Sequence, residues 1–348
     1  MSKKELIKKI KAEIKQNEGI SVSKFMELAL FDQDNGYYVS ERIFGEKGDF
    51  ITSPEISQIF SEIIAVFIHY KWQEEKNGGK LQLIELGPGR GVMMHDILRS
   101  LRSLGDLYNN IEVILYEKSD QLRKIQLAKL AEFNNINISH ISDLNEVAKK
   151  NSFILANEFF DALPINQYEY CKNKWFERIV DLKNEDFVFS LSKNEAKFLK
   201  ANIQNKEGDI FEKSDASLLI MEQLAKFIKT TNSKALIIDY GYVKKSYGDS
   251  LQAMKNHKYI DVFADIGSSD ITAHVDFEIL AALALKHNNK ALITTQREFF
   301  EQLGFRARNN ILKQNANEIQ KEKLDYAEKK ILDEAEMGDL FKVLYVES

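Results

Sequence analysis

The chain has 348 residues, of which 44% are hydrophobic and 29% are charged, as in ordinary globular proteins. Its formal net charge of -5 gives no overall reason to expect a nucleic-acid partner. The single cysteine, Cys171, excludes an intrachain disulfide and a cysteine-based metal site, and such composition is typical of a reducing compartment.

The N-terminal stretch from Met1 to Asn17 has apolar residues at helical spacing among many lysines. Glu5 and Glu13 argue against an organellar presequence, because such sequences contain few acidic residues. We therefore expect an amphipathic first helix and a cytoplasmic protein. No apolar run approaches the roughly 20 residues that a membrane helix needs, so we expect no membrane insertion.

Two further helices are predicted before the first strand. Ser21 and Ser23 are both candidates to cap the second helix. Ser53 as N-cap, followed by Pro54 and an acidic first turn, predicts a helix that continues to about Phe67. These elements predict a helical N-terminal cap over residues 1–80.

An apolar run from Leu81 to Leu86 leads into a loop with alternating glycines. Gly87, Gly89 and Gly91 are followed by apolar residues at helical spacing, which predicts a strand, a tight loop and a helix. Glycines allow a ligand to approach the backbone, and the helix start offers unpaired N–H groups. A dinucleotide fingerprint would require a third glycine where Val92 stands, so the loop indicates another nucleoside cofactor.

Two carboxylates accompany this loop. Glu85, just before the glycines, is poorly placed beside a pyrophosphate but suits the cationic amino group of S-adenosylmethionine. Glu117 closes the next apolar run, 111–116, about where a ribose-binding acid is expected. Together these features favour a methyltransferase-type site over a structural turn between a strand and a helix. No histidines are paired at metal-ligand spacing, so we expect no metal.

From Leu81 onward, apolar runs alternate with helical patterns, which predicts a doubly wound α/β sheet. The four predicted strands are 81–86, 111–116, 136–141 and 153–156. Ligands in such sheets bind outside the carboxyl ends of the strands, so the residues after each run are site candidates. Asp143, after the third run, either meets the adenine edge or caps a helix.

The segment after the fourth run supplies polar acceptors, namely Asn157, Glu158 and Asp161. Carboxylates suit a basic acceptor, because a guanidinium ion stays protonated and presents its donors in a planar fork. These residues are therefore predicted to be catalytic. The alternative is that Glu158 and Asp161 form structural hydrogen bonds under a loop.

The pattern changes near Gln167, where short strand-like segments precede a helix. We predict a catalytic domain over 81–348 with an inserted, partner-facing lobe at about 167–232. Two strands near the C-terminus, at 289–295 and 341–346, are expected to close the sheet in antiparallel fashion. The charged segment 314–330 is predicted to be a solvated helix.

Several motifs occur in an order that is specific to one family. They are Asn35–Tyr38, Gly48–Glu55, Glu85–Gly91, Asn157–Pro164, Asp239–Gly241, Asp270–Phe277, Thr295–Gln296 and Met337–Lys342. In these motifs the chain resembles the MidA-type S-adenosylmethionine-dependent methyltransferases, which include mitochondrial complex I assembly factors that methylate arginine. The resemblance implies a class I, Rossmann-like methyltransferase fold with a helical addition and an inserted lobe. It also implies S-adenosylmethionine as cofactor, with Thr52 among the residues that bind it.

The resemblance further implies methylation of an arginine in a quinone-module core subunit of respiratory complex I, in support of its assembly. The residues alone leave two alternatives. One is a methyltransferase for another protein or a small molecule, and the other is a non-catalytic assembly chaperone with a vestigial cofactor site. We expect a protein substrate and no nucleic acid, and homodimer formation is left open.

Overall fold

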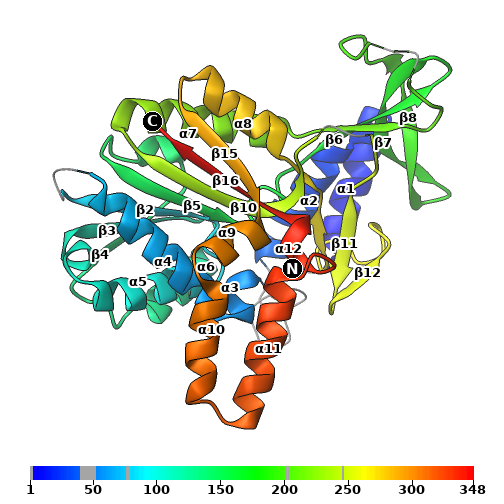
Figure 1. Ribbon diagram of the computed structural model, residues 1–348. Coiled ribbons are helices and arrows are strands. Elements are labelled where there is room, and N and C mark those ends of the chain that lie inside the picture. Colours follow the sequence, from blue (N-terminus) through cyan, green and yellow to red (C-terminus); the bar gives the residue numbers. More distant parts are fainter. Residues whose placement is uncertain (1–2, 40–51, 76–78, 201, 203, 245–246) are drawn as a thin grey trace. The chain divides into compact units, whose positions relative to one another are not determined.

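The computed structural model describes residues 3–39, 52–75, 79–200, 202, 204–244 and 247–348 (Figure 1). By their contacts the residues form two compact units. The first comprises Met1–Phe50, Asp161–Ile220 and Lys244–His274, and the second Ile51–Phe160, Met221–Val243 and Val275–Ser348. The predicted cap, 1–80, contains residues of both units, and the predicted domain boundaries remain a prediction. Residues 48–51 of the family motif lie outside the described residues.

The second unit is built around a large mixed sheet. Among the described residues its strands lie in the order β15-β16-β10-β5-β2-β3-β4, with β14 beside β10. Their bounds are β2 Leu81–Leu86, β3 Ile111–Tyr116, β4 Asn137–Ile141, β5 Ser152–Asn157, β10 Lys234–Tyr242, β14 Val275–Asp276, β15 Lys290–Thr295 and β16 Phe341–Glu347. Neighbours from β4 to β10 are parallel, whereas β16 is antiparallel to both β10 and β15. The predicted α/β sheet with an antiparallel closing pair is confirmed.

Apolar side chains on one face of this sheet form the largest core cluster. Leu83, Val113 and Leu155, on three neighbouring strands, are buried there with side chains of α4 (Gln58–Gln73) and α5 (Val92–Leu104). The short helices α9 (Gln296–Gln302) and α12 (Met337–Leu340) contribute to the same cluster. Figure 1 shows α8 (Phe277–Lys286) on the other side of the sheet, where it contacts β10, β15 and β16. Both faces of the strands are thus covered, as their apolar sequences predict.

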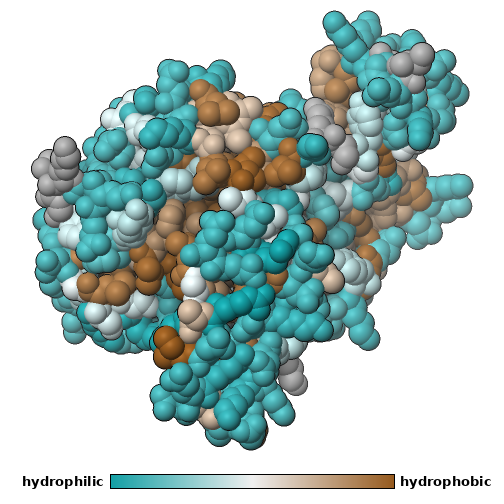
Figure 2. All heavy atoms as spheres, viewed as in Figure 1, coloured by the Kyte–Doolittle hydropathy of each residue, from teal (hydrophilic) through white to brown (hydrophobic). Residues whose placement is uncertain are grey.

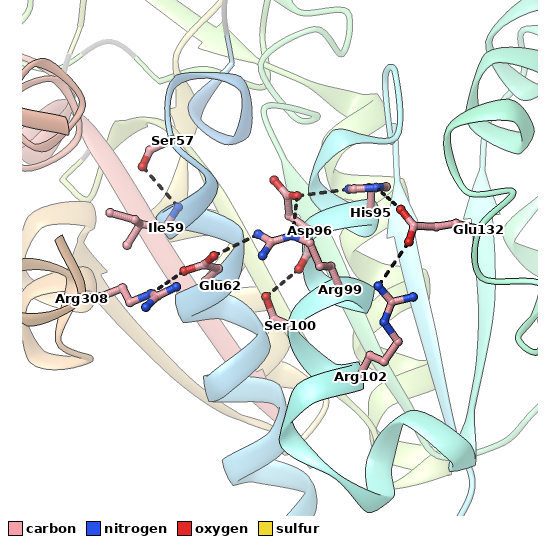
Figure 3. A network of polar contacts seen from close by, with 10 residues as sticks. All are labelled: Ser57, Ile59, Glu62, His95, Asp96, Arg99, Ser100, Arg102, Glu132 and Arg308. Atoms are coloured by element: carbon pink, nitrogen blue, oxygen red, sulfur yellow. Dashed lines mark hydrogen bonds and ion pairs between the residues drawn. The ribbon is translucent and has the colours of Figure 1, made fainter. Parts of the chain in front are cut away.

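The helix predicted from Ser53 to Phe67 is interrupted near its start. In the structure α3 (Ser53–Ile56) ends at Ser57, whose backbone is extended with φ -151° and ψ 124°. Ser57 Oγ accepts a hydrogen bond from the Ile59 N–H at 3.3 Å and caps α4 (Figure 3). Thr52, rather than Ser53, is the N-cap of α3. The prediction of one continuous helix was wrong, because Ser57 provides a second cap within the apolar pattern.

A buried carboxylate connects three helices of the second unit. Glu62 of α4 is 7% exposed; its Oε1 lies 2.9 Å from Arg99 Nη2 of α5 and its Oε2 lies 2.8 Å from Arg308 Nε. Arg308 belongs to α10 (Phe305–Gln314), and Figure 3 shows Glu62 between the two arginines. Two cations compensate the buried charge, which would otherwise be costly. The network therefore fixes α10 against the helices that cover the sheet.

The helix α11 (Glu318–Leu332) follows α10, and the two form a helical hairpin (Figure 1). Only Ala327, Ile331 and Leu332 of α11 are buried, and the surface of the hairpin is mostly hydrophilic in Figure 2. The predicted solvated helix at 314–330 is confirmed, although it begins at Glu318. No helix in the described ranges is long and apolar enough to cross a membrane.

The first unit combines two helices with two antiparallel sheets. The helices are α1 (Lys3–Asn17) and α2 (Val22–Phe31), and Ser21 caps α2 by accepting the Lys24 N–H at 3.0 Å. One sheet contains β1 Ile20–Ser21, β6 Asn166–Cys171, β7 Lys174–Lys183, β8 Asp186–Glu195 and β9 Ile210–Lys213. The other contains β11 Gln252–Lys255, β12 Lys258–Ile260 and β13 Asp270–Thr272. The strand-like segments predicted after residue 167 are thus confirmed as strands. The predicted helix that follows them is also observed, as α7 (Asp215–Thr231).

Candidate cofactor and acceptor site

The glycine loop between β2 and α5 has a backbone that favours glycine at three positions. Gly87, Gly89 and Gly91 have φ values of 62°, 52° and 76°, in the left-handed region. A Cβ on Gly87 would lie 2.8 Å from Cδ2 of Phe159, so the Phe159 ring packs directly on this backbone. A Cβ on Gly89 would have no neighbour within 4 Å among the described atoms. Gly89 therefore borders open space that a ligand can occupy.

Glu85 lies at the end of β2, immediately before this loop. It is 2% exposed, and its Oε2 has no hydrogen-bond partner among the described residues. Burial raises the pKa of Glu85 to about 8. A buried carboxylate is costly unless it is paired, so the residue suits a cationic ligand group. The ammonium of S-adenosylmethionine fits this requirement.

Glu117 follows β3 and is held by hydrogen bonds. Its Oε1 accepts the Ser119 N–H at 2.9 Å, and its Oε2 lies 3.3 Å from Nε2 of Gln126. Arg123 donates from Nε and Nη2 to the Glu117 carbonyl oxygen, at 2.8 and 2.6 Å. Burial raises the pKa of Glu117, although the hydrogen bonds oppose this shift. The carboxylate is thus oriented at the carboxyl end of β3, where a cofactor ribose was predicted.

Gln126, which the sequence pattern did not single out, connects Glu117 with the glycine loop. It lies on α6 (Asp120–Lys129) and is fully buried. Its Nε2 donates to the Gly89 carbonyl oxygen at 2.7 Å, and its Oε1 pairs with His140 Nε2 of β4 at 2.8 Å. Because an amide oxygen only accepts, this contact assigns the proton to Nε2 of His140. The available signal was a polar residue on the otherwise apolar buried face of α6.

The predicted acceptor segment begins where β5 ends. Glu158 has φ 49°, a left-handed conformation that is uncommon outside glycine. Its Oε1 accepts the Ser53 N–H at 2.9 Å and Nδ2 of Asn157 at 3.0 Å. The next residue, Phe159, is the one that packs on Gly87. The structure therefore brings Asn157 and Glu158 together with the glycine loop.

Thr52 lies beside the same segment, as N-cap of α3 and neighbour of Ser53. Glu55 of α3 also reaches the glycine loop, since its Oε1 lies 3.3 Å from Nη1 of Arg90. This ion pair connects the start of α3 with the loop. Thr52 is half-buried, and its role in cofactor binding stays a prediction.

Asp143 and Asp161 are placed less informatively. Asp143 is exposed after β4 and caps a short 3-10 helix, where its Oδ1 accepts the Asn145 N–H at 2.9 Å. The capping alternative is observed, and a contact with adenine stays a prediction. Asp161 is buried in the first unit, where its carbonyl oxygen accepts the Ala273 N–H at 3.0 Å. Its catalytic role also stays a prediction.

Comparisons with known proteins agree with this site. The family of S-adenosyl-L-methionine-dependent methyltransferases matches residues 63–295. The chain is 34% identical to human mitochondrial protein arginine methyltransferase NDUFAF7, over 90% of this chain and 76% of the relative. The Xenopus laevis protein of the same name is 32% identical, over 96% of this chain and 82% of the relative.

A solved structure supports the fold. A Burkholderia thailandensis protein crystallised with S-adenosyl-homocysteine superposes with a TM-score of 0.84 at 23% identity, covering 99% of this chain and 92% of that one. A native structure from the same organism gives a TM-score of 0.83 at 24% identity. The predicted class I methyltransferase fold is confirmed.

The comparisons correct the expected location. We predicted a cytoplasmic protein, but the curated relatives from human, frog and Caenorhabditis elegans are labelled mitochondrial. The prediction was wrong because it rested on the acidic residues of the first helix, which describe only that helix.

The cofactor follows from the family and from the residues present. The partnerless Oε2 of Glu85 and the open space beside Gly89 fit a ligand with a cationic group and a close backbone approach. These features suit S-adenosylmethionine, on which the family depends. The chain is an enzyme that belongs to the S-adenosyl-L-methionine-dependent methyltransferase family, together with the protein arginine methyltransferases NDUFAF7.

Proposed function

We propose that the enzyme methylates an arginine side chain of a protein, with Glu158 binding the acceptor guanidinium. The observation that carries this proposal is the position of the Glu158 carboxylate, which two donors hold at the end of β5, next to a residue that packs on the glycine loop. The names of the curated relatives support arginine as the acceptor.

A fixed carboxylate suits this acceptor for two physical reasons. A guanidinium ion stays protonated at physiological pH and binds carboxylates through a planar fork of donors. The hydrogen bonds from Ser53 and Asn157 orient Glu158 before the acceptor arrives, so little reorganisation is needed during the reaction. Glu158 would align the acceptor nitrogen and accept positive charge as the nitrogen loses a proton.

The remaining site residues are assigned to binding and orientation. S-adenosylmethionine supplies the methyl group on a sulfonium sulfur, and the protein supplies the geometry. Glu85 would pair with the ammonium, Glu117 with the ribose hydroxyls, and the backbone at Gly87 and Gly89 would line the cofactor. Gly91 would allow the close start of α5.

Three further roles complete the proposal. Thr52 would contact the cofactor from the start of α3, and Asp143 would meet the adenine edge from the end of β4. Asp161 would act with Glu158 and Asn157 on the acceptor. These assignments are supported by sequence position, and each is testable by substitution.

We also propose a quinone-module core subunit of respiratory complex I as the protein substrate, and a role in complex I assembly. The family resemblance in the sequence motifs supports this substrate. The lobe at about 167–232, which the sequence predicts as an insertion into the catalytic domain 81–348, would face the partner.

The test compares arginine methylation in complex I between cells that carry the wild-type chain and cells that carry Glu158→Gln. Peptide mass spectrometry of the quinone-module subunits is the measurement. The matched control is Glu322→Gln, because Glu322 is exposed on α11, away from the described site residues. Methylation lost in Glu158→Gln and kept in the control is the expected result.

Other outcomes would reject specific parts of the proposal. Identical methylation in both cell types, or none in either, would remove complex I as the substrate. If Glu158→Gln abolished no methylation but deletion of the chain still blocked complex I assembly, the chaperone alternative would replace catalysis.

A further inference from the structure

Asp239 ends β10 and makes an unusual set of contacts with the acceptor segment. The residue is fully buried. Its Oδ2 accepts the N–H groups of Phe159 and Phe160, at 3.2 and 2.9 Å. Its Oδ1 accepts the N–H of Tyr240 at 2.9 Å. One carboxylate on β10 thus binds the chain that leaves the neighbouring strand, β5.

These contacts surround the left-handed residue Glu158. The Glu158 N–H donates to the Ile238 carbonyl oxygen at 2.9 Å, which extends the pairing of β5 with β10 by one residue. The next two N–H groups turn to the side chain of Asp239 instead of continuing the ladder. A left-handed conformation at a non-glycine residue is unfavourable and persists only where surrounding contacts impose it. Asp239 supplies those contacts.

A carboxylate is required here by its hydrogen-bond capacity. Both oxygens of Asp239 accept from backbone N–H groups, and an ionised carboxylate is an acceptor only. An asparagine would direct its NH₂ group either at Tyr240 or at the pair Phe159 and Phe160. One donor would then face another donor, whichever way the amide was turned. Asp239→Asn is therefore a small change in shape that breaks one side of the arrangement.

The same segment is held at its other side by packing. The Phe159 ring lies against Gly87, and its centroid is 6.1 Å from that of Tyr116 at the end of β3. The backbone of Phe159 is therefore bound to β10 while its ring rests on the glycine loop. Glu158 lies between β5 and this anchored residue, so its position depends on both.

We propose that Asp239 is a positioning residue for methyl transfer: through the N–H groups of Phe159 and Phe160 it holds Glu158 in the conformation that binds the acceptor. The inference rests on the proposed role of Glu158. It goes beyond that role because it assigns a function to a buried carboxylate on another strand, which touches neither cofactor nor acceptor. Displacing a reacting group by about 1 Å is enough to cost about 100-fold in rate.

The first experiment separates positioning from general destabilisation. Asp239→Asn is compared with the wild-type chain and with Asp106→Asn, a matched control at an exposed position. With labelled S-adenosylmethionine and extract from the host as acceptor, we expect kcat to fall about 100-fold in Asp239→Asn. Cofactor affinity, measured by calorimetry, should change by less than about threefold because Glu85 and Glu117 keep their contacts. Equal losses in kcat and cofactor affinity would overturn the proposal.

A double-mutant cycle tests whether Asp239 acts through Glu158. In the Glu158→Gln background, Asp239→Asn should reduce the single-turnover rate by less than about threefold, because the group that it positions is already lost. If the two losses multiplied as independent effects, Asp239 would not act through Glu158 and the proposal would be wrong.

Hydrogen exchange on the wild-type protein decides the matter if Asp239→Asn fails to fold. The amides of Phe159 and Phe160 should exchange as slowly as those within β5, since both are bound to a buried carboxylate. Exchange as fast as that of an exposed loop would contradict the anchoring. This result is independent of the acceptor, so it stands even if wild-type protein methylates no arginine and the proposed function fails.

Discussion

Two carboxylates of the same sheet, Glu85 on β2 and Asp239 on β10, differ sharply in their surroundings. Both are buried, at 2% and 0% exposure. Asp239 accepts three backbone N–H groups, whereas Oε2 of Glu85 has no partner among the described residues. Their strands flank β5, the strand that leads to Glu158. The fold thus completes one carboxylate with its own backbone and leaves the other to a ligand.

The difference shows how hydrogen-bond accounting separates a structural carboxylate from a ligand-binding one. Buried polar atoms are nearly always paired, so an exception marks a place where the protein has given up stability. Sites that bind ligands commonly carry such a cost. The following predictions test this distinction, beginning with the largest expected effect.

Gly89→Val should remove the cofactor side of the comparison most completely. Its side chain would fill the open space beside the loop, so affinity for S-adenosylmethionine should fall by more than about 100-fold. The folded protein should lose only about 1–2 kcal/mol of stability, mainly from the left-handed backbone. Calorimetry and urea unfolding measure the two quantities. Gly304→Val is the matched control, since Gly304 also has a positive φ and a Cβ added there would have no neighbour within 4 Å among the described atoms.

Glu85→Gln should weaken cofactor binding while leaving the glycine loop in place. The loss of a charge-assisted contact with the ammonium predicts about 10- to 100-fold lower affinity at pH 8. The loss should be smaller near pH 6, because the pKa of about 8 keeps Glu85 protonated there before the ligand binds. Affinity that is equal for both proteins across this range would show that Glu85 does not meet the ammonium.

The same substitution should have the opposite effect on the stability of the cofactor-free protein. Folding raises the pKa of Glu85 from its ordinary value of 4.5 to about 8, so the folded state holds this proton more tightly than the unfolded chain. Wild-type stability is therefore lost as pH rises from about 5 to 8, by up to about 1.4 kcal/mol per pH unit. Glu85→Gln lacks this loss and should gain on the wild type over that range. A pH-independent difference in urea unfolding would rule out the raised pKa.

Gln126→Leu should have an intermediate effect, because it removes a support of Glu117 rather than a ligand contact. One hydrogen bond to a carboxylate is lost, so we expect about tenfold weaker cofactor binding. In a Glu117→Gln background the same change should have little further effect. Gln314→Leu, at an exposed position on α10, is the control. Unchanged affinity in Gln126→Leu would separate Glu117 from the cofactor.

Asp143→Ser should have the smallest effect and distinguishes the two roles of this residue. Serine still caps a helix but is too short to reach an adenine edge, so stability should be retained. A contact with adenine predicts about threefold to tenfold weaker cofactor binding. Affinity within error of the wild type would leave Asp143 with its capping role alone.

The sequence predicted the sheet well because its strands are short, apolar and separated by clear turn signals. The bounds of β2 and β3 match the predicted runs 81–86 and 111–116. Glu85, the glycines and Glu117 were also found, since each follows directly from the end of a strand. The interruption at Ser57 was missed because the apolar pattern continues through it.

The supporting residues of the site could not be predicted in the same way. Gln126 and Asp239 bind backbone groups that lie 37 and about 80 residues away in the chain. Such pairings depend on which strands become neighbours and on the path of the loops between them. Periodicity describes which face of an element is buried, but it does not identify the partner of a buried polar atom.

The most direct test of arginine methylation at this site is the transfer of a deuterated methyl group from S-adenosylmethionine by the purified enzyme. The labelled product, formed in a protein extract of the host, is located by tandem mass spectrometry. We predict label on an arginine with the wild-type chain and with Glu322→Gln, and none with Gly89→Val or Glu158→Gln. Label on another residue type, or equal labelling by Glu158→Gln, would contradict the proposed arginine site.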